Sequence, residues 1–294
     1  WIERLMPPVV TGAVVAVIGL NLAAVPVKNM APTSFDAWMQ AITFVLIALV
    51  AIFTSGMTRR VLVLVGLILA SVVYALLTNG LGLGKPISGD LLAKAAWFGA
   101  PNFMAPVFDA KAIVLIAPVA LILVAENLGH LRAVGAMTGR NMDPYLGRAF
   151  LGDGVATMVS GSVGGTGVTT YAENIGVMAA TRVYSTALFV IAAVFAIVLG
   201  FSPKFGALIH TIPLPVMGGV SIVVFGLIAV AGAKIWVDNK VDFADGRNLM
   251  VAAITLVLGT GDFTLKFGDF AMGGIGTATF GAIILNAVLS SGKK

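Results

Sequence analysis

The sequence has no cysteine, only two histidines and few charged residues. Without cysteine the chain cannot form disulfides, thiolate nucleophiles or cysteine-ligated metal sites. The histidines, His130 and His210, lie too far apart in the sequence to suggest a metal centre by themselves. Charged residues make up 11% of the chain, against about 25% in soluble domains, and hydrophobic residues make up 59%. This balance excludes an ordinary water-soluble domain.

The apolar residues come in long runs rather than in alternation. Residues 8–27 and 184–200 contain no Asp, Glu, Lys or Arg, and as helices they would cross much of the ~30 Å hydrocarbon core of a bilayer. The 35 glycines suit close helix packing and broken helices in lipid. We therefore predict an all-α polytopic membrane protein with ten membrane elements, near residues 7–27, 37–54, 61–78, 112–131, 147–163, 166–182, 184–200, 212–232, 248–260 and 272–290.

The basic residues favour one orientation in the membrane. With a cytoplasmic N-terminus, ten crossings return the C-terminus to the same side, and the cytoplasmic segments then hold 12 of the 18 Lys and Arg residues, including every Arg. An excess of Lys and Arg is typical of cytoplasmic loops. The formal charge of +5 therefore indicates membrane topology and not nucleic-acid binding. The first residues, WIERLMPP, lack the basic, apolar and small-residue series of a cleavable signal peptide.

A short motif occurs twice in the chain and predicts an internal repeat. Its two copies are Pro8-Val9-x-x-Gly12 followed by Gly19-Leu20, and Pro215-Val216-x-x-Gly219 followed by Gly226-Leu227. In the predicted layout the two helices run in opposite directions through the membrane. Similar segments in opposite orientation are typical of inverted-repeat secondary transporters.

Glu126 and His130 form the first candidate site, in the apolar segment PVALILVAENLGHLR. Ionisable groups at membrane depth cost about 2.5–3.5 kcal/mol on insertion scales, so each one requires a reason. The i, i+4 spacing places both side chains on one helical face, where a carboxylate and an imidazole can share and exchange a proton. The alternative is an ion pair at a helix end near Arg132. A metal site would need further ligands.

Glu173 forms the second candidate site, in SGSVGGTGVTTYAENIGVMAATRV. The preceding glycines do not sustain a helix, and residues 168–171 predict a short strand. We expect a helix to restart at residues 172–174, which would place unpaired backbone N–H groups near the bilayer middle, beside the Glu173 carboxylate. Transporters use such broken helices to bind substrate. The alternative is a re-entrant loop with a packing role only.

Two further ionisable residues have simpler explanations. Asp153, in FLGDGVATM, is expected to pair with Arg148 or to cap a helical turn. His210, in ALIHTIPLP, is expected at an extracellular loop or short helix.

Three segments resemble the nucleobase–cation symporter 2 family, also called nucleobase–ascorbate transporters: AENLGH at 125–130, GDGVATMVSG at 152–161 and TTYAENIGVMAATRVYST at 169–186. Glu173-Asn174-x-Gly176-x-x-x-x-Thr181-Arg182 matches the family signature without a gap. The segments SPKFGALIHTIPLPVMGG and VFGLIAVAGAKIWV most resemble its bacterial pyrimidine permeases.

The resemblance implies a fold of fourteen segments in two inverted sets of seven, divided into a core and a gate. Residues 1–80 would be the first half of the gate (segments 5–7), 81–111 an extracellular loop, 112–203 the second half of the core (segments 8–11) and 204–294 the second half of the gate (segments 12–14). Four N-terminal segments would then be missing here, and with them the partner strand of residues 168–171. We therefore expect residues 1–294 alone not to transport.

The resemblance also implies roles for individual residues. Glu126 and Glu173 would accept hydrogen bonds from ring N–H groups of the base, and the backbone N–H of Ala172 would donate to a carbonyl. Uracil permeases usually have Gly at that position, so Ala172 would narrow the pocket slightly. Asn174 and Tyr171 would shape the site. His130 would support Glu126 and take part in proton coupling.

The predicted function is therefore a proton symporter that imports uracil or a related pyrimidine across the inner membrane. The coupling ion would be a proton, with no cofactor, no metal and no nucleic-acid partner, and the gate helices would form a homodimer. A xanthine or other purine permease of the same fold is the first alternative. An anion transporter of the sulfate/bicarbonate type is disfavoured because two carboxylates repel anions. A membrane enzyme or redox subunit has no nucleophile–base motif or paired haem-ligand histidines to support it.

Overall fold

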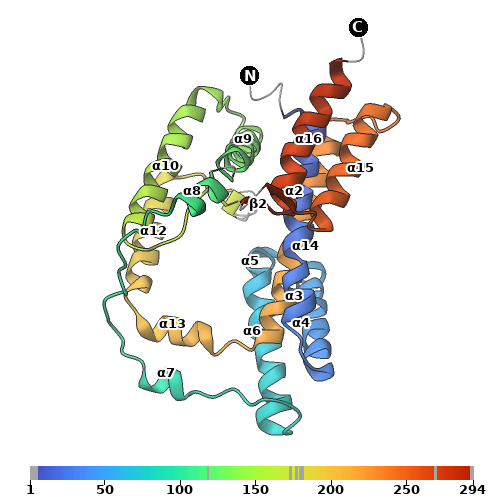
Figure 1. Ribbon diagram of the computed structural model, residues 1–294. Helices are drawn as coiled ribbons and strands as arrows, with labels where there is room; N and C mark the ends of the chain where they lie inside the picture. The colour runs from blue at the N-terminus through green and yellow to red at the C-terminus, as the bar shows by residue number, and fades with distance from the viewer. Residues whose placement is uncertain are drawn as a thin grey trace. The chain divides into compact units, whose positions relative to one another are not determined.

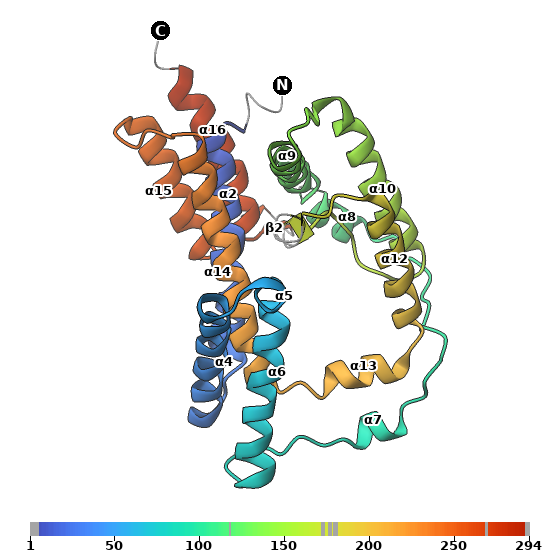
Figure 2. The ribbon, with the colours of Figure 1, turned by 180° about the vertical axis from the view of Figure 1, so that it is seen from behind.

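A computed structural model describes residues 6–117, 119–171, 174–175, 178, 182–267 and 270–291. These residues are mostly helical, as Figures 1 and 2 show from opposite sides. Two compact units divide the chain. Unit 1 comprises residues 1–24, 104–175 and 224–294, and unit 2 comprises residues 25–103 and 176–223.

Unit 1 contains most of the candidate site residues. Its elements are α2 (Pro8–Leu22), α8 (Ala110–Ile116), α9 (Val119–Thr138), the 3₁₀-helix η2 (Asp143–Tyr145), α10 (Leu146–Ser162), the second part of α14 (Leu214–Asp238), α15 (Gly246–Thr260), β1 (Leu265–Phe267), β2 (Phe270–Met272) and α16 (Gly274–Ser291). The two strands pair antiparallel, with Leu265 opposite Met272 and Phe267 opposite Phe270.

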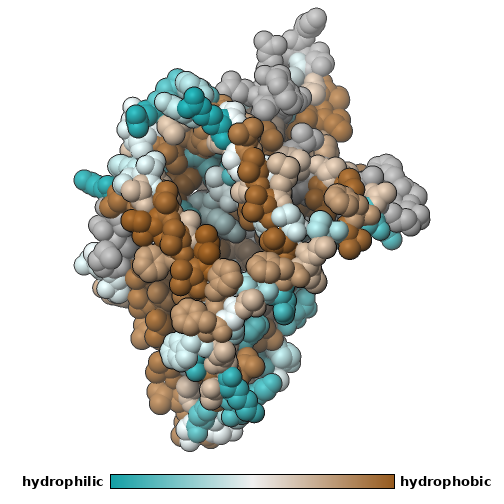
Figure 3. Space-filling view, turned by 90° about the vertical axis from the view of Figure 1, so that its left-hand side faces the viewer, coloured by the Kyte–Doolittle hydropathy of each residue, from teal (hydrophilic) through white to brown (hydrophobic). Residues whose placement is uncertain are grey.

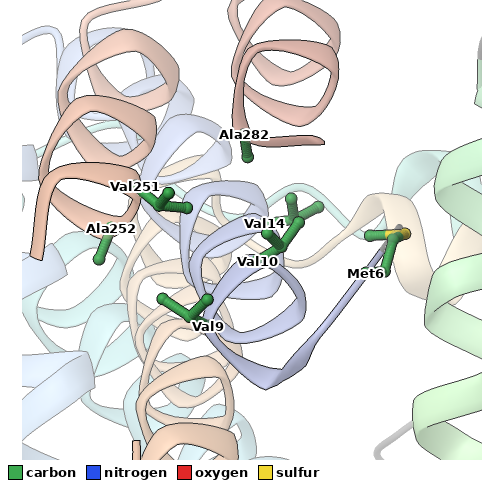
Figure 4. Close-up of a cluster of buried hydrophobic side chains, with 7 residues drawn as sticks. All are labelled: Met6, Val9, Val10, Val14, Val251, Ala252 and Ala282. Carbon is green, nitrogen blue, oxygen red and sulfur yellow. The ribbon is translucent and has the colours of Figure 1, made fainter. Parts of the chain in front are cut away.

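Small and branched side chains form the core of unit 1, where α2 packs against α15 and α16 (Figure 4). Val10 and Val251 are fully buried, and Ala282 is 1% exposed. Residues Met6, Val9, Val14 and Ala252 complete the cluster. Removing such side chains from contact with lipid gives little hydrophobic gain, so close van der Waals packing must hold these helices together.

Glycines allow α2 and the second part of α14 to touch backbone to backbone. A Cβ atom on Gly232 would lie 2.6 Å from the carbonyl oxygen of Gly12, and one on Gly19 would lie 2.6 Å from the backbone nitrogen of Ala229. Nε1–H of Trp236 donates to the carbonyl oxygen of Val9 at 3.1 Å across the same contact. Only glycine fits at such a crossing.

Asp262 joins three segments at the other end of this bundle. Its Oδ1 accepts from the backbone N–H of Gly274, the first residue of α16, at 2.8 Å, and from Nδ2 of Asn21 at 3.4 Å. Nδ2 of Asn21 also donates to the carbonyl oxygen of Gly259 at 2.8 Å. The Asp262 carboxylate thus satisfies an N–H group at a helix start, where negative charge is favoured.

Unit 2 is made of helices. Its elements are α3 (Ala24–Asn29), α4 (Ser34–Phe53), α5 (Gly56–Arg60), α6 (Leu62–Ala75), the π-helix η1 (Leu76–Gly80), α7 (Asp90–Lys94), α12 (Thr186–Gly200), α13 (Pro203–His210) and the first part of α14. Met39, Ala70, Tyr74 and Val216 form its buried cluster, so α4, α6 and α14 share one core. Both ribbon views show α4 and α6 beside the start of α14.

Local sequence explains where several helices begin. Thr33 and Asp36 form a capping box at the start of α4, in which the Thr33 hydroxyl accepts from the Asp36 backbone N–H at 3.1 Å. Asp245 caps α15 through the Arg247 backbone N–H at 2.9 Å, and Ser202 caps α13 through the Phe205 backbone N–H at 3.3 Å.

Several helices are suited to a bilayer. Among the described residues, four helical stretches are long and apolar enough to span one: Pro8–Asn29, Ser34–Phe53, Leu62–Gly80 and Leu214–Asp238. A bent pair, Thr186–Gly200 with Pro203–His210, is a fifth candidate with an 85° bend. Large apolar side chains are widely exposed, including Phe195 at 65% and Met158 at 67%, and the space-filling view shows broad hydrophobic surface (Figure 3). Such surface needs lipid or protein around it.

The helix predictions are confirmed for nine of the ten ranges, each of which coincides with a described helix or helix pair. The tenth range, 166–182, lies partly outside the described residues. The predicted strand at residues 168–171 is wrong: these residues are in neither helix nor strand, and β1 and β2 are the only strands among the described residues. The division into core and gate stays a prediction.

Candidate substrate and proton site

Helix α9 carries the first pair of predicted site residues. Glu126 and His130 lie one turn apart on this 20-residue helix, so the sequence spacing places them on one face. The imidazole of His130 is partly buried. The side chain of Glu126 lies outside the described part of the structure.

A chain of hydrogen bonds starts at His130 and crosses three segments of unit 1. Nδ1 of His130 lies 2.7 Å from Oγ1 of Thr170. That hydroxyl donates to Oδ1 of Asn127 at 2.6 Å, and Nδ2 of Asn127 donates to the Asp153 carboxylate on α10. Asn127 is only 2% exposed. An imidazole is therefore connected to a carboxylate through a hydroxyl and a buried amide.

Side chains of α10 hold the irregular segment that carries Thr170. The Thr157 hydroxyl donates to the carbonyl oxygen of Val168 at 3.0 Å and accepts from its backbone N–H at 3.2 Å. The Ser160 hydroxyl donates to the carbonyl oxygen of Thr166 at 2.7 Å. Hydroxyl groups thus satisfy both backbone groups of Val168 and the carbonyl oxygen of Thr166, which are described here without a partner strand.

The remaining predicted site residues are only partly described. Tyr171 is 62% exposed, and Asn174 is helical and exposed. Ala172 and Glu173 lie outside the described residues. The structure therefore places His130 beside the segment that carries Thr170. That Glu126 and Glu173 bind the same substrate molecule stays a prediction.

Sequence reasoning missed Asn127 and Thr170, and it gave Asp153 the wrong partner. Arg148 lies over the Tyr145 ring, 5.8 Å from its centroid, while Asp153 binds Asn127. Asp153 follows Arg148 by five positions, a spacing that puts the two side chains on different faces of α10. Asn127 could have been suspected from the sequence because it is a polar residue beside Glu126 in an apolar helix.

A second feature lies in unit 2, on α7 and α13. A shallow pocket is lined by Lys94, His210 and the apolar side chains of Leu91, Ala95, Pro203 and Ala207. His210 is exposed at the end of α13, which agrees with its predicted place on a short helix. No three His, Asp or Glu side chains gather as a metal site among the residues that the structure describes.

Known proteins match the chain over most of its length. A family model described as "Permease family" matches residues 1–267. The chain is 68% identical over 290 residues to the putative pyrimidine permease RutG of Escherichia coli (strain K12), which covers 99% of this chain and 66% of that protein. It is 40% identical over 294 residues to a uracil permease of Paenibacillus larvae subsp. larvae (97% of this chain, 69% of that protein). It is also 40% identical over 305 residues to a uracil permease of Bacillus caldolyticus (98% and 69%). The chain spans about two thirds of the length of these relatives.

Proposed function

We propose that this chain, which belongs to that permease family, forms part of a transporter that imports uracil or a related pyrimidine across the inner membrane together with protons. The main support from the structure is the polar chain from His130 to Asp153. Polar and ionisable groups among apolar helices are costly, and in membrane proteins they mark substrate and proton pathways. The names of the similar uracil permeases support the substrate class.

The chemistry of uracil suits the proposed site. Uracil is neutral and flat, and its two ring N–H donors alternate with carbonyl acceptors. The carboxylates of Glu126 and Glu173 would accept from the N–H groups, and the backbone N–H of Ala172 would donate to a carbonyl. Asn174 and Tyr171 would border the base. The same carboxylates disfavour an anionic substrate.

Uptake by cells tests the substrate. Bacteria that lack their own nucleobase permeases would express the full-length protein that contains this sequence, and uptake of labelled uracil would be compared with uptake of labelled xanthine. We expect saturable uracil uptake that falls when a protonophore collapses the proton gradient. Uptake of xanthine with no uracil uptake would assign the site to purines. Uracil uptake that the protonophore does not change would show that transport is not coupled to protons.

We further propose that the helices form two inverted repeats. The packing of the two motif-bearing helices supports this: α2 packs with α15 and α16 in unit 1, and the start of α14 packs with α4 and α6 in unit 2. Each motif helix thus contacts helices from the opposite half of the sequence. We also propose that both ends of this chain lie on the cytoplasmic side, which ten crossings and the distribution of Lys and Arg favour.

A homodimer through helices of the ranges 1–80 and 204–294 is a further proposal, based on the family resemblance. The exposed apolar side chains of α4, such as Ile52 at 73% and Phe53 at 78%, are compatible with a partner or with lipid. The mass of the purified protein in detergent, measured by light scattering, would distinguish a dimer from a monomer.

A further inference from the structure

Asn127 can be oriented from its two partners. Its amide group has one donor end and one acceptor end. A carboxylate accepts hydrogen bonds, and Asp153 accepts from Nδ2 of Asn127, so the donor end of the amide lies toward α10. A rotated amide would place Oδ1 against a carboxylate oxygen and leave two acceptors in contact. The acceptor end, Oδ1, therefore points at Thr170.

The position of the Thr170 proton follows from this orientation. The threonine hydroxyl has a single proton, and the contact of 2.6 Å between Oγ1 of Thr170 and Oδ1 of Asn127 uses it. Oγ1 can then only accept from Nδ1 of His130, which lies 2.7 Å away. Nδ1 of His130 must therefore carry a proton. These three hydrogen bonds, called the relay below, all point from His130 toward Asp153.

We propose that Asn127, Thr170 and Asp153 are positioning residues that fix the His130 tautomer. They keep a proton on Nδ1 in both charge states of the imidazole, so that a proton binds to and leaves from Nε2 only. In the neutral state the ring carries Nδ1–H, and one added proton at Nε2 gives the imidazolium. The same proton leaves from Nε2, and the Nδ1–H group and the relay are unchanged.

The ionisable groups around His130 are compatible with this assignment. Glu126 lies one turn earlier and Arg132 two residues later on α9, Tyr171 follows Thr170, and α10 contributes Asp153. Helices α2 and α16 also contact α9, and neither carries an ionisable side chain. The described hydrogen bonds connect Asp153 to His130 through Asn127 and Thr170.

The histidine content makes a direct measurement possible. His130 and His210 are the only histidines in the sequence. In a His210→Gln background, protein labelled with ¹⁵N-histidine would give one imidazole spectrum, and nitrogen shifts distinguish Nδ1–H from Nε2–H. We expect the neutral His130 ring to carry its proton on Nδ1. A neutral Nε2–H ring in this protein would overturn the proposal.

Variants separate the relay from general stability. Thr170→Val removes the acceptor of Nδ1–H, and Thr170→Ser keeps it. Asp153→Asn keeps the shape but replaces the carboxylate by an amide that no longer dictates the direction of the relay. Thr157→Val is the matched control because it removes a hydroxyl that holds the same segment through the backbone of Val168. We expect the tautomer to change in Thr170→Val and Asp153→Asn, and to stay Nδ1–H in Thr170→Ser and Thr157→Val.

Uptake against pH gives the functional consequence. Uptake in Thr170→Val and Asp153→Asn should fall about tenfold or more at the wild-type optimum, with a changed pH profile. Thr157→Val should lower uptake by the same factor at every pH, so that the shape of the pH profile does not change. If Thr170→Val does not reach the membrane, Asp153→Asn carries the test. An unchanged tautomer and pH profile in the relay variants would overturn the proposal. The uptake measurement depends on the proposed transport function, whereas the imidazole spectrum does not, so the two can fail separately.

Discussion

The carbonyl oxygen of Gly12 lies 2.6 Å from the place that a Cβ atom on Gly232 would occupy. We predict that Gly232→Ala destabilises the protein, because an added methyl group would push α2 and α14 apart at a backbone contact. Overpacking of this kind costs about 1–3 kcal/mol. Thermal unfolding of the purified protein, followed by intrinsic fluorescence, would show the loss as a lower midpoint.

Gly226 supplies the matched control for this substitution. It lies on the same helix, and a Cβ atom there would meet nothing within 4 Å among the described residues. Because alanine favours helix over glycine by about 0.5–1 kcal/mol, Gly226→Ala should leave the midpoint unchanged or raise it. Equal destabilisation by both substitutions would show that the α2–α14 crossing does not limit stability.

Trp236 contributes a polar contact at the same crossing. Trp236→Phe would remove the hydrogen bond from Nε1 to the Val9 carbonyl oxygen, while keeping an aromatic ring edge-on to Phe243, whose ring centroid lies 5.2 Å away. We expect a loss of about 0.5–1.5 kcal/mol in stability. The control is Trp38→Phe, since Trp38 is 69% exposed. A thermal midpoint for Trp236→Phe that matches the Trp38→Phe value would contradict a stabilising role for this bond.

The sequence predicted the helices well because their physical cause is local. Long apolar runs and caps such as Thr33 with Asp36 lie within a few residues of the helices that they determine. The hairpin of β1 and β2 was not predicted. Each strand has only three residues, and so short an apolar run has no period that distinguishes a strand from other structure.

The polar chain at the candidate site could be predicted only in part. The i, i+4 spacing pointed to His130, but its partners come from distant segments: Thr170 is 40 residues from His130, and Asp153 is 26 residues from Asn127. Side-chain pairs at such separations depend on how helices pack, which one sequence does not reveal. The strand at 168–171 was predicted from residue preference, but a strand also needs a partner, and in the described residues the backbone of Val168 bonds to the Thr157 hydroxyl instead.

The absence of native cysteine makes the predicted membrane orientation simple to test. Asn102 and Asn239 are both exposed asparagines in loops that the charge pattern places on opposite sides. We expect Asn102→Cys to react with a membrane-impermeant maleimide in intact cells, and Asn239→Cys to react only after permeabilisation. The cysteine-free parent is the background control. The reverse labelling pattern would show that the protein lies in the membrane in the opposite orientation.

His130 is predicted to carry the coupling proton together with Glu126. In His130→Leu the imidazole is replaced by a side chain that cannot bind a proton, and uptake should lose its pH dependence more than equilibrium binding of uracil loses affinity. His210→Leu is the control because His210 is exposed at the end of α13. Full uptake with normal pH dependence in His130→Leu would assign coupling to another group.

Glu173 is predicted to be required for substrate binding. It directly precedes Asn174 and Ile175, which are helical, and in the proposed site its carboxylate accepts a ring N–H of the base. The change Glu173→Gln replaces one carboxylate oxygen by an NH₂ group and removes the negative charge, so the ring N–H loses its charged acceptor. Loss of one partner of a buried charged hydrogen bond costs about 2–5 kcal/mol, so binding of labelled uracil to purified protein should weaken by about tenfold or more. Asp143→Asn, at an exposed position at the start of η2, applies the same chemical change away from the site and should leave affinity unchanged. Wild-type affinity in Glu173→Gln, at normal expression, would remove Glu173 from the site and leave Glu126 as the carboxylate that binds the base.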